Sequence, residues 1–204
     1  MIDWNRIDRA HGVIFDCDGT LVDSMPVHYL AWHRTMSEVG IRFDEDRFYA
    51  LGGMPSHRII ELLAGEQQVV VDPLQTAHRK EEAFLDSIHL LERIHPVVDV
   101  AERLRGNKPI AVASGGFRSI VLRQLVQVDL ADWFDIIVAA EDTVHHKPEP
   151  DVFLETARRM AVAPEGCLVF EDSDLGIEAA RRAGMGWIDV RTFYQAKRIP
   201  VPKS

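Results

Sequence analysis

The stretch GVIFDCDGTLVDS, residues 12–24, decides the fold. Its apolar start, GVIF, is typical of a short buried strand. Asp16 and Asp18 flank Cys17 at the point where that strand must end, and Gly19-Thr20 then breaks the regular backbone. Because two carboxylates this close repel each other, something positively charged must hold them together.

Further apolar runs along the chain have the Val and Ile content of strands that are covered on both faces. The predicted parallel strands are 12–15, 109–114, 134–140, 167–171 and 186–190. Apolar residues at helical spacing predict helices over 117–128, 151–161 and 175–183, with Gly184 as a C-cap. This alternation of strands and helices indicates an α/β fold with a doubly wound parallel sheet.

The segment between the first two predicted strands has a helical pattern instead. MPVHYLAWHRTMSEVG, residues 25–40, is amphipathic and ends in glycine, and helical patterns follow at 56–65 and 73–94. A chain of 204 residues has room for one core and a small inserted domain. We therefore expect a helical cap over 20–95, inserted into a core of residues 1–19 plus 96–204.

The composition excludes several classes of protein. With 47% hydrophobic and 27% charged residues the chain is typical of a soluble globular protein. A net charge of -9 argues against binding to nucleic acid or to an anionic membrane. No segment has the pattern of a signal peptide or a membrane span, so we expect a cytoplasmic protein. The tail at 196–204 is expected to be peripheral.

The two cysteines, Cys17 and Cys167, match no metal-binding spacing. Both lie in or beside apolar runs, and we interpret them as reduced thiols of the core. Cys17 should point away from the two aspartates that flank it. A catalytic thiol would need a nearby base or cation to activate it, and we disfavour that interpretation of Cys17.

Polar residues gather where the predicted strands end, and in an open parallel sheet a ligand binds outside these carboxyl ends. The groups are Asp16 and Asp18, Ser114-Gly115-Gly116, His145-His146-Lys147, and Glu171-Asp172-Ser173-Asp174. Clustered carboxylates are ligands that Mg²⁺ prefers, and a cation would relieve their repulsion. Ser173 and Asp174 have an equally good interpretation as helix-capping residues.

A metal, a lysine and a hydroxyl at one edge point to a phosphorylated substrate, whose oxygens need positive charge and donors. A carboxylate can then be the nucleophile and form an aspartyl phosphate. Asp16 suits this role because it ends a strand and should be rigid. Asp18, two residues on, can protonate the leaving alcohol and then deprotonate water.

Four motifs extend this interpretation to a family. DCDGT (16–20), ASGG (113–116), KPEPDVF (147–153) and FEDSDLGIEAA (170–180) together resemble, in order, the motifs of the haloacid dehalogenase superfamily of phosphotransferases. The resemblance implies a Rossmann-like core with a mobile α-helical cap of type C1, as in the β-phosphoglucomutase-like branch. The second aspartate and the acidic fourth motif resemble the phosphatases of the superfamily, not its dehalogenases.

The same resemblance implies roles for individual residues. Asp16 would be the nucleophile and Asp18 the general acid and base, while Ser114, beside Gly115, would contact the transferring phosphoryl group. Lys147 would bridge that group and the nucleophile.

The implied cofactor is Mg²⁺. Its ligands would be Asp16, the main-chain carbonyl of Asp18, Asp172, and Glu171 either directly or through water.

The predicted cap contributes further candidates. His28 and Trp32 lie one helical turn apart in HYLAW. We favour a functional His28 over a surface histidine, and a Trp32 in the core of the cap. Lys80 matches a lysine that faces the site in relatives, and a solvated lysine is the rival interpretation. Arg58 is a weaker candidate that could simply pair with an acid on a helix surface.

One cap loop departs from the mutase pattern. Mutases of this branch carry G-x-S-R, whose arginine holds the distal phosphate of a bisphosphate, whereas this chain has Gly53-Met54-Pro55-Ser56. We place Gly53 beside the substrate. Without the arginine, hydrolysis of a monophosphate is favoured over mutase activity.

The sequence therefore predicts a Mg²⁺-dependent phosphatase that acts on small phosphorylated sugars through a phospho-aspartate. GGMPSHRI and VFEDSDLGIEAARRAGM are similar to bacterial fructose-1-phosphate phosphatases. A sugar phosphomutase of the β-phosphoglucomutase type is the alternative. A non-enzymatic receiver-like module is more distant, because it would need neither Asp18 nor a cap. The sequence leaves the physiological sugar open, and a moving cap is compatible with a monomer.

Overall fold

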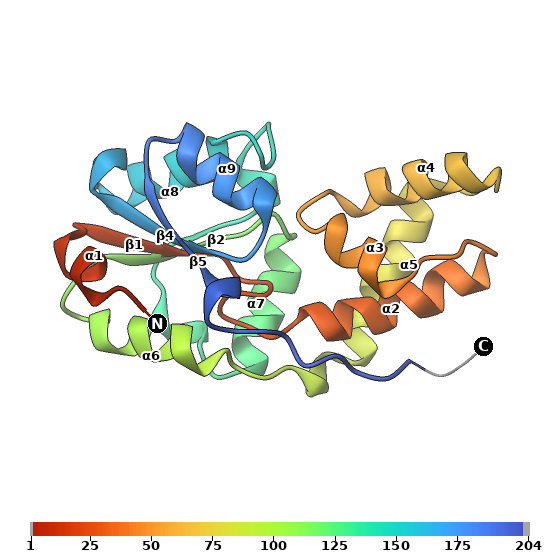
Figure 1. Ribbon diagram of the computed structural model, residues 1–204, viewed down its shortest axis with the longest axis horizontal. Coiled ribbons are helices and arrows are strands. Elements are labelled where there is room, and N and C mark those ends of the chain that lie inside the picture. Colours follow the sequence, from red (N-terminus) through yellow and green to blue (C-terminus); the bar gives the residue numbers. More distant parts are fainter. Residues whose placement is uncertain (1, 202–204) are drawn as a thin grey trace.

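A central parallel sheet organises the computed structural model, which describes residues 2–201 (Figure 1). Within this range five strands hydrogen-bond in the order β3-β2-β1-β4-β5. The strands are β1 Gly12–Phe15, β2 Ile110–Ala113, β3 Ile137–Val138, β4 Cys167–Glu171 and β5 Gly186–Asp189. The opening stretch thus forms the middle strand, and the predicted α/β sheet is confirmed.

Helices cover both faces of the sheet. The helices of this lobe are α1 Trp4–Arg9, α6 His95–Leu104, α7 Arg118–Gln127, α8 Asp151–Met160 and α9 Asp174–Arg182. Side chains alternate across β1, so that Val13 and Phe15 pack with α6 and α7, and Ile14 packs with α8 and α9. Figure 1 shows the two helical layers above and below the strands.

The third strand is shorter than the predicted 134–140. It lies at the sheet edge and pairs with β2 only at Ile137 and Val138. The chain then turns into a short 3₁₀ helix because Asp142 Oδ2 accepts a hydrogen bond from Ala139 N at 2.7 Å. The 3₁₀ helices are Ile88–Leu90, Ala131–Trp133, Ala140–Asp142, Pro164–Gly166 and Val190–Thr192.

A second lobe consists of helices from the inserted segment. They are α2 Met25–Glu38, α3 Glu45–Ala50, α4 Ser56–Gln67 and α5 Pro73–Asp86. Their apolar faces form a separate cluster that includes Trp32, Met36, Phe48 and Ile60, all nearly inaccessible to solvent. Trp32 is therefore a cap core residue, as predicted. We refer to this lobe as the cap.

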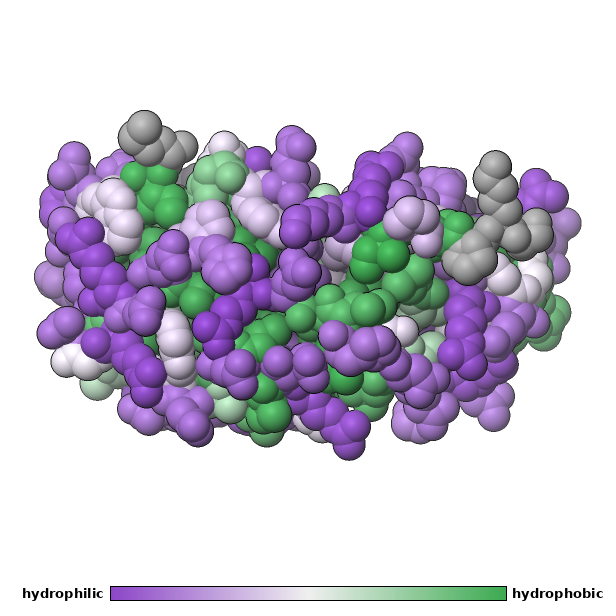
Figure 2. Space-filling model, turned by 90° about the horizontal axis from the view of Figure 1, so that it is seen from below, coloured by the Kyte–Doolittle hydropathy of each residue, from purple (hydrophilic) through white to green (hydrophobic). Residues whose placement is uncertain are grey.

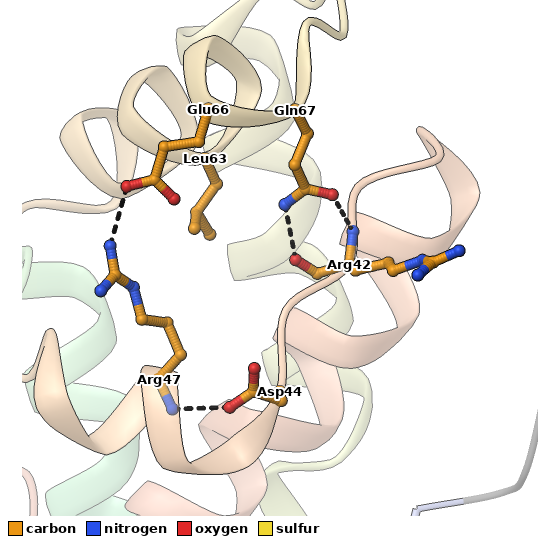
Figure 3. Close-up of a pocket in the computed structure, with 6 residues that line it drawn as sticks. All are labelled: Arg42, Asp44, Arg47, Leu63, Glu66 and Gln67. Atoms are coloured by element: carbon orange, nitrogen blue, oxygen red, sulfur yellow. Dashed lines mark hydrogen bonds and ion pairs between the residues drawn. The ribbon is translucent and has the colours of Figure 1, made fainter.

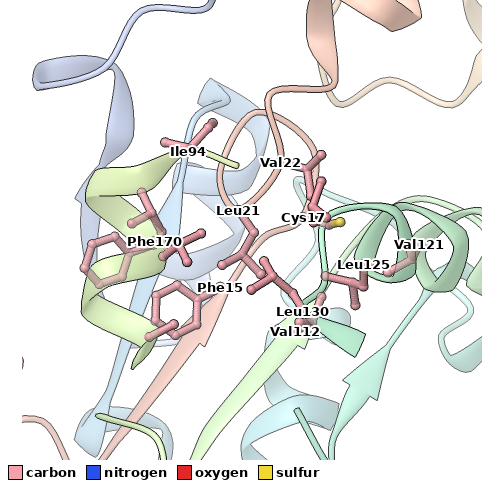
Figure 4. Packing of buried hydrophobic residues seen from close by; sticks show 14 of the residues in the cluster. Phe15, Cys17, Leu21, Val22, Ile94, Val112, Val121, Leu125, Leu130 and Phe170 are labelled. Atoms are coloured by element: carbon pink, nitrogen blue, oxygen red, sulfur yellow. The ribbon is translucent and has the colours of Figure 1, made fainter. Parts of the chain in front are cut away.

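The chain crosses between the two lobes at two adjacent segments. Asp23 N donates to Glu92 O at 2.9 Å, and Ile94 N donates to Leu21 O at 3.0 Å. Leu21, Val22 and Ile94 pack beside Phe15 and Phe170 of the sheet (Figure 4). These paired crossings anchor the cap to the core, and the limits of 20–95 for the insertion stay a prediction.

The described part of the C-terminal tail, up to residue 201, lies at the surface as expected, and residues 202–204 lie outside the described residues. Lys197 pairs with Glu92 near a crossing, and Arg198 pairs with Glu45 and Asp46 of the cap. Ile199 packs against the core cluster, whereas Val201 packs against the cap cluster. The tail therefore contacts both lobes.

The surface is largely polar. Figure 2 shows charged and polar side chains over most of one face, with apolar side chains gathered near its middle. None of the helices among residues 2–201 has the length and apolar character needed to cross a membrane.

Candidate active site

The loop after β1 places Asp16 and Asp18 at the carboxyl edge of the sheet. Asp16 N donates to Phe170 O of β4 at 3.0 Å, so the backbone that carries the Asp16 side chain is fixed by the sheet. The carbonyl of Cys17 then accepts hydrogen bonds from Thr20, Leu21 and Val22 N, which closes a tight turn. The Cys17 side chain points into the core, as predicted (Figure 4).

Gly19 is required in this turn for two reasons. Its φ is +74°, a conformation that side chains disfavour, and a Cβ there would lie 2.1 Å from Asp172 Oδ2. The small residue thus lets the loops after β1 and β4 approach each other. Thr20 Oγ1 donates to Asp172 Oδ1 at 3.4 Å across the same contact.

The structure brings together three carboxylates and a lysine. One oxygen from each of Asp16, Glu171 and Asp172 lies within 4.8 Å of the others. Lys147 Nζ donates to Asp16 Oδ1 and to Glu171 Oε2, both at 2.7 Å, and Lys147 is 7% exposed. They come from three separate segments of the sequence, at or after the ends of β1, β3 and β4, as the strand-end argument predicted.

The electrostatics of this cluster show an excess of negative charge. Burial and the neighbouring carboxylates raise the pKa of Asp16 to about 8, although Lys147 opposes the shift. Burial and the charge of Glu171 raise the pKa of Asp172 well above its usual range. A hard divalent cation fits this set, because its donors are buried carboxylate oxygens that a positive charge would keep ionised.

The loop after β4 orients Glu171. Its Oε1 accepts hydrogen bonds from Asp172 N, Ser173 N and Ser173 Oγ, the last at 2.8 Å. Ser173 also caps α9 through Gly176 N, which confirms the capping interpretation for Ser173. Asp174 is 89% exposed and pairs with Arg191, so it takes no part in the cluster.

Ser114 lies at the end of β2, next to Asp18. Ser114 is 1% exposed, and its Oγ accepts a hydrogen bond from Gly116 N at 3.0 Å. A Cβ at Gly116 would lie 3.6 Å from Asp18 Oδ2, which places this loop against the aspartate. The Gly115 backbone lies exposed at the same turn.

Asp18 contacts two residues at the start of cap helix α2, Ser24 and His28. Its Oδ1 accepts a hydrogen bond from Ser24 Oγ at 2.6 Å and lies 3.0 Å from His28 Nε2. Burial opposes ionisation of Asp18, but His28 and the hydrogen bonds lower its pKa below the usual range. The structure therefore places His28 directly beside Asp18.

The contacts continue into the cap. His28 Nδ1 lies 2.9 Å from Lys80 Nζ, and the His28 ring stacks on Phe84 with 3.9 Å between ring centroids. Lys80 is 3% exposed, which contradicts the rival interpretation of a solvated lysine. Lys80 Nζ also donates to Glu81 Oε1 at 3.1 Å. Sequence reasoning missed Glu81 and Ser24, because neither stands in a recognisable motif.

The cap loop contacts the core. A Cβ at Gly53 would lie 3.3 Å from Leu175 Cβ and 3.4 Å from Ser173 Oγ, so the cap is closed onto the loop after β4. Arg58 pairs with Glu61 at 2.8 Å on the surface of α4, which confirms the plainer interpretation of Arg58. His145 likewise pairs with Asp151 and is largely exposed.

A separate cavity of about 510 Å³ lies within the cap (Figure 3). Its lining consists of Arg42, Asp44, Arg47, Leu63, Glu66 and Gln67. Arg47 is paired with Glu66, and Gln67 is hydrogen-bonded to the backbone of Arg42. Because no residue of the carboxylate cluster lines it, we assign this cavity no part in catalysis.

Comparison with known proteins agrees with this geometry. The model of the haloacid dehalogenase-like hydrolase family matches residues 13–190. The chain belongs to this family, as the four motifs predicted. Its sheet, its strand-end carboxylates and the position of its helical insertion all fit that assignment.

Individual relatives span nearly the whole chain. Fructose-1-phosphate phosphatase YqaB of Escherichia coli (strain K12) is 42% identical over 188 residues, which cover 90% of this chain and 98% of that protein. Beta-phosphoglucomutase of Bacillus subtilis (strain 168) is 30% identical over 183 residues, which cover 85% of this chain and 80% of that protein.

A solved beta-phosphoglucomutase from Clostridium difficile superimposes with a TM-score of 0.77, covering 88% of this chain and 84% of that one. Its sequence is 22% identical, so it supports the fold alone.

Proposed function

We propose that this protein is a Mg²⁺-dependent phosphatase that hydrolyses small sugar phosphates, such as fructose 1-phosphate, through a phospho-aspartate. One observation carries the proposal: Asp16 belongs to a cluster with Lys147, Glu171 and Asp172, and Asp18, two residues further along the same loop, contacts His28. A nucleophile, a cation site and a proton donor thus meet at one point. Names of relatives such as YqaB support the sugar phosphate as substrate.

Asp16 is the proposed nucleophile. Its carboxylate would attack phosphorus and form an acyl phosphate while the sugar oxygen departs. Lys147, 2.7 Å from Asp16 Oδ1, would balance the charge of the nucleophile and of the phosphoryl oxygens. Ser114 Oγ, at the adjacent strand end, would donate to the same phosphoryl group.

The proposed metal ligands are Asp16, Asp172, the main-chain carbonyl of Asp18, and Glu171 directly or through water. When bound, Mg²⁺ supplies positive charge to the carboxylates and to the phosphoryl oxygens. The donor set consists of oxygens, which fits this ion.

Asp18 is the proposed general acid and base. It would protonate the leaving sugar oxygen and later take a proton from the attacking water. In this arrangement Asp18 is ionised, so its proton must arrive through a partner. His28, 3.0 Å away and itself bonded to Lys80, is suited to supply it.

The closed cap would exclude water during the first step and enclose the sugar. Gly53 and Lys80 approach the site from different cap elements, and we propose that both face the leaving group. The family and the cap together leave no support for the receiver-like alternative.

A phosphomutase is the second candidate, since a relative that is 30% identical is named beta-phosphoglucomutase. Ser56 argues against it, because no arginine stands there to hold a second phosphate.

The deciding experiment measures phosphate release from a panel of sugar phosphates, with and without Mg²⁺. We expect Mg²⁺-dependent release from neutral sugar monophosphates by the wild type and none by Asp16→Asn. Asp174→Asn, an exposed acid on the same edge, is the matched control and should keep wild-type activity. Conversion of β-glucose 1-phosphate to glucose 6-phosphate without phosphate release would establish the mutase instead.

A further inference from the structure

The proposed mechanism leaves one carboxylate of the cap unused. Glu81 Oε1 accepts hydrogen bonds from Lys80 Nζ at 3.1 Å and from Ser56 Oγ at 3.2 Å. The Glu81 side chain is 17% exposed, whereas that of Glu82, the next residue, is 64% exposed. Glu81 therefore faces the interior between cap helices and is not one of the solvated acids of α5.

Glu81 is also electrostatically connected to the catalytic centre. Burial opposes its ionisation, but Lys80 and His28 hold its pKa below the usual value, while Asp18 acts in the opposite sense. Glu81 is consequently negatively charged at neutral pH. It ends a chain of contacts that runs from Asp18 through His28 and Lys80.

The second oxygen of this carboxylate is available to a ligand. Among residues 2–201, no protein hydrogen bond engages Oε2 of Glu81, and both of the bonds described above reach Oε1. An ionised carboxylate only accepts hydrogen bonds. Its natural partner in a sugar is a hydroxyl group, whereas a phosphate or a carboxylate at that position would be repelled.

The neighbouring cations offset this repulsion only in part. Lys80 is already bonded to His28 and Glu81. Arg58, two residues after Ser56, pairs with Glu61, and its side chain is 65% exposed. On the cap side of the His28–Lys80 contact, the next polar groups are therefore the carboxylate of Glu81 and the hydroxyl of Ser56.

We infer that Glu81 determines the specificity for the leaving group. It accepts a hydrogen bond from a neutral hydroxyl and disfavours any leaving group that carries a second phosphate or a carboxylate. The substrates are then monophosphates of neutral polyhydroxy compounds. This inference rests on the proposed function, because it concerns the alcohol half of the substrate.

The test compares two sugars that differ by one phosphate. For wild type, Glu81→Gln and Glu82→Gln, kcat/KM is measured with fructose 1-phosphate and with fructose 1,6-bisphosphate. We expect the wild type to prefer the monophosphate, and Glu81→Gln to reduce that preference about ten-fold, the size of one removed charge repulsion at moderate dielectric. Glu82→Gln should keep the wild-type ratio.

The ratio isolates specificity, because a loss of folded enzyme lowers the rate with both substrates of the same variant by the same factor. An unchanged ratio in Glu81→Gln overturns the inference while the phosphatase activity stands. Absence of phosphate release from both sugars by the wild type overturns the proposed function and the inference with it.

A second measurement needs no variant and therefore does not depend on the folding of Glu81→Gln. Salt screens a charge that is only 17% exposed less than it screens an exposed one, so the preference of the wild type should fall modestly as ionic strength rises from about 0.01 M to 1 M. A preference that rises with ionic strength would contradict a role for the charge of Glu81.

Discussion

At the scale of single residues, the site concentrates buried charge of one sign. Asp16, Glu171 and Asp172 lie together, and Lys147 compensates them only in part. Burial penalises the negative charges of Asp16 and Asp172 and raises the pKa of both carboxyl groups. Such a group of carboxylates could hold a cation. If it does, the stability of the fold should depend on the concentration of that cation.

We predict that Mg²⁺ raises the free energy of unfolding of the wild type. At a concentration of 100 times the dissociation constant, binding to the native state alone adds about 2.7 kcal/mol. Asp172→Asn should lose most of this gain, and Asp174→Asn should retain it. Thermal unfolding with and without Mg²⁺ checks this, and an equal gain in Asp172→Asn would remove Asp172 from the ligand set.

The two proposed roles of Asp18, protonation of the leaving group and deprotonation of water, can be tested separately. Asp18→Asn should slow hydrolysis of sugar phosphates by about 10² to 10⁴, the usual contribution of general acid–base catalysis. With p-nitrophenyl phosphate, whose leaving group needs no proton, we expect a burst of nitrophenolate followed by slow turnover. A near-normal steady-state rate with sugar phosphates would show that Asp18 is not the acid and base.

At the scale of elements, Asp142 joins three segments around the edge strand β3. Its carboxylate accepts hydrogen bonds from Ala139 N, from Arg159 of α8 and from Arg118 of α7. Its side chain is 17% exposed. These contacts hold the short strand where the sheet itself provides little pairing.

Asp142 should make the stability of the protein depend on pH. Burial opposes its ionisation, but the hydrogen bond from Ala139 and the two arginines hold its pKa below the usual value. A lowered pKa in the folded state stabilises above the unfolded pKa of about 3.9, and this contribution is lost as the pH falls through the folded value.

The variant Asp142→Asn should therefore be less stable than the wild type by about 1 kcal/mol at pH 7, with a smaller difference below pH 4. Urea unfolding at pH 7 and pH 3.5 measures both differences. A difference that grows toward acid would contradict the assignment.

At the scale of the whole molecule, the two lobes are joined at the chain crossings and again by the C-terminal tail. Tyr194 Oη donates to Asp23 Oδ2 at 2.5 Å beside one crossing, and Asp23 is 6% exposed. Further along, Arg198 reaches Glu45 and Asp46 of the cap. The tail thus connects the core to the cap.

These two tail contacts should differ in strength. Tyr194→Phe leaves a buried carboxylate without its donor, which should reduce the free energy of unfolding by about 1–3 kcal/mol. Arg198→Ala removes exposed ion pairs, which are worth less than about 1 kcal/mol. Chemical unfolding of both variants provides the comparison. A larger loss in Arg198→Ala would show that the exposed pairs dominate.

Much of the fold was readable from sequence because its signals are local. Strands 12–15 and 167–171 coincide with β1 and β4, whose apolar runs are bounded by turn residues. The edge strand β3 was overestimated, since the contact of Asp142 with Ala139 N that ends it follows from the tertiary arrangement. The short helices α1 and α3 were missed for want of a long periodic pattern.

The candidate site was predictable in its core and less so in its cap. The sequence by itself determined the carboxylates, Ser114 and Lys147 as a group, because parallel strands bring their carboxyl ends to one edge. Only the tertiary structure decided that Lys80 is buried against His28, that Glu81 turns inward while Glu82 faces solvent, and that the tail reaches the cap. The physical reason is that Glu81 and Glu82 are the same residue type on one helix, so the sequence does not distinguish them. Their exposure depends on which parts of the cap pack against each face of that helix.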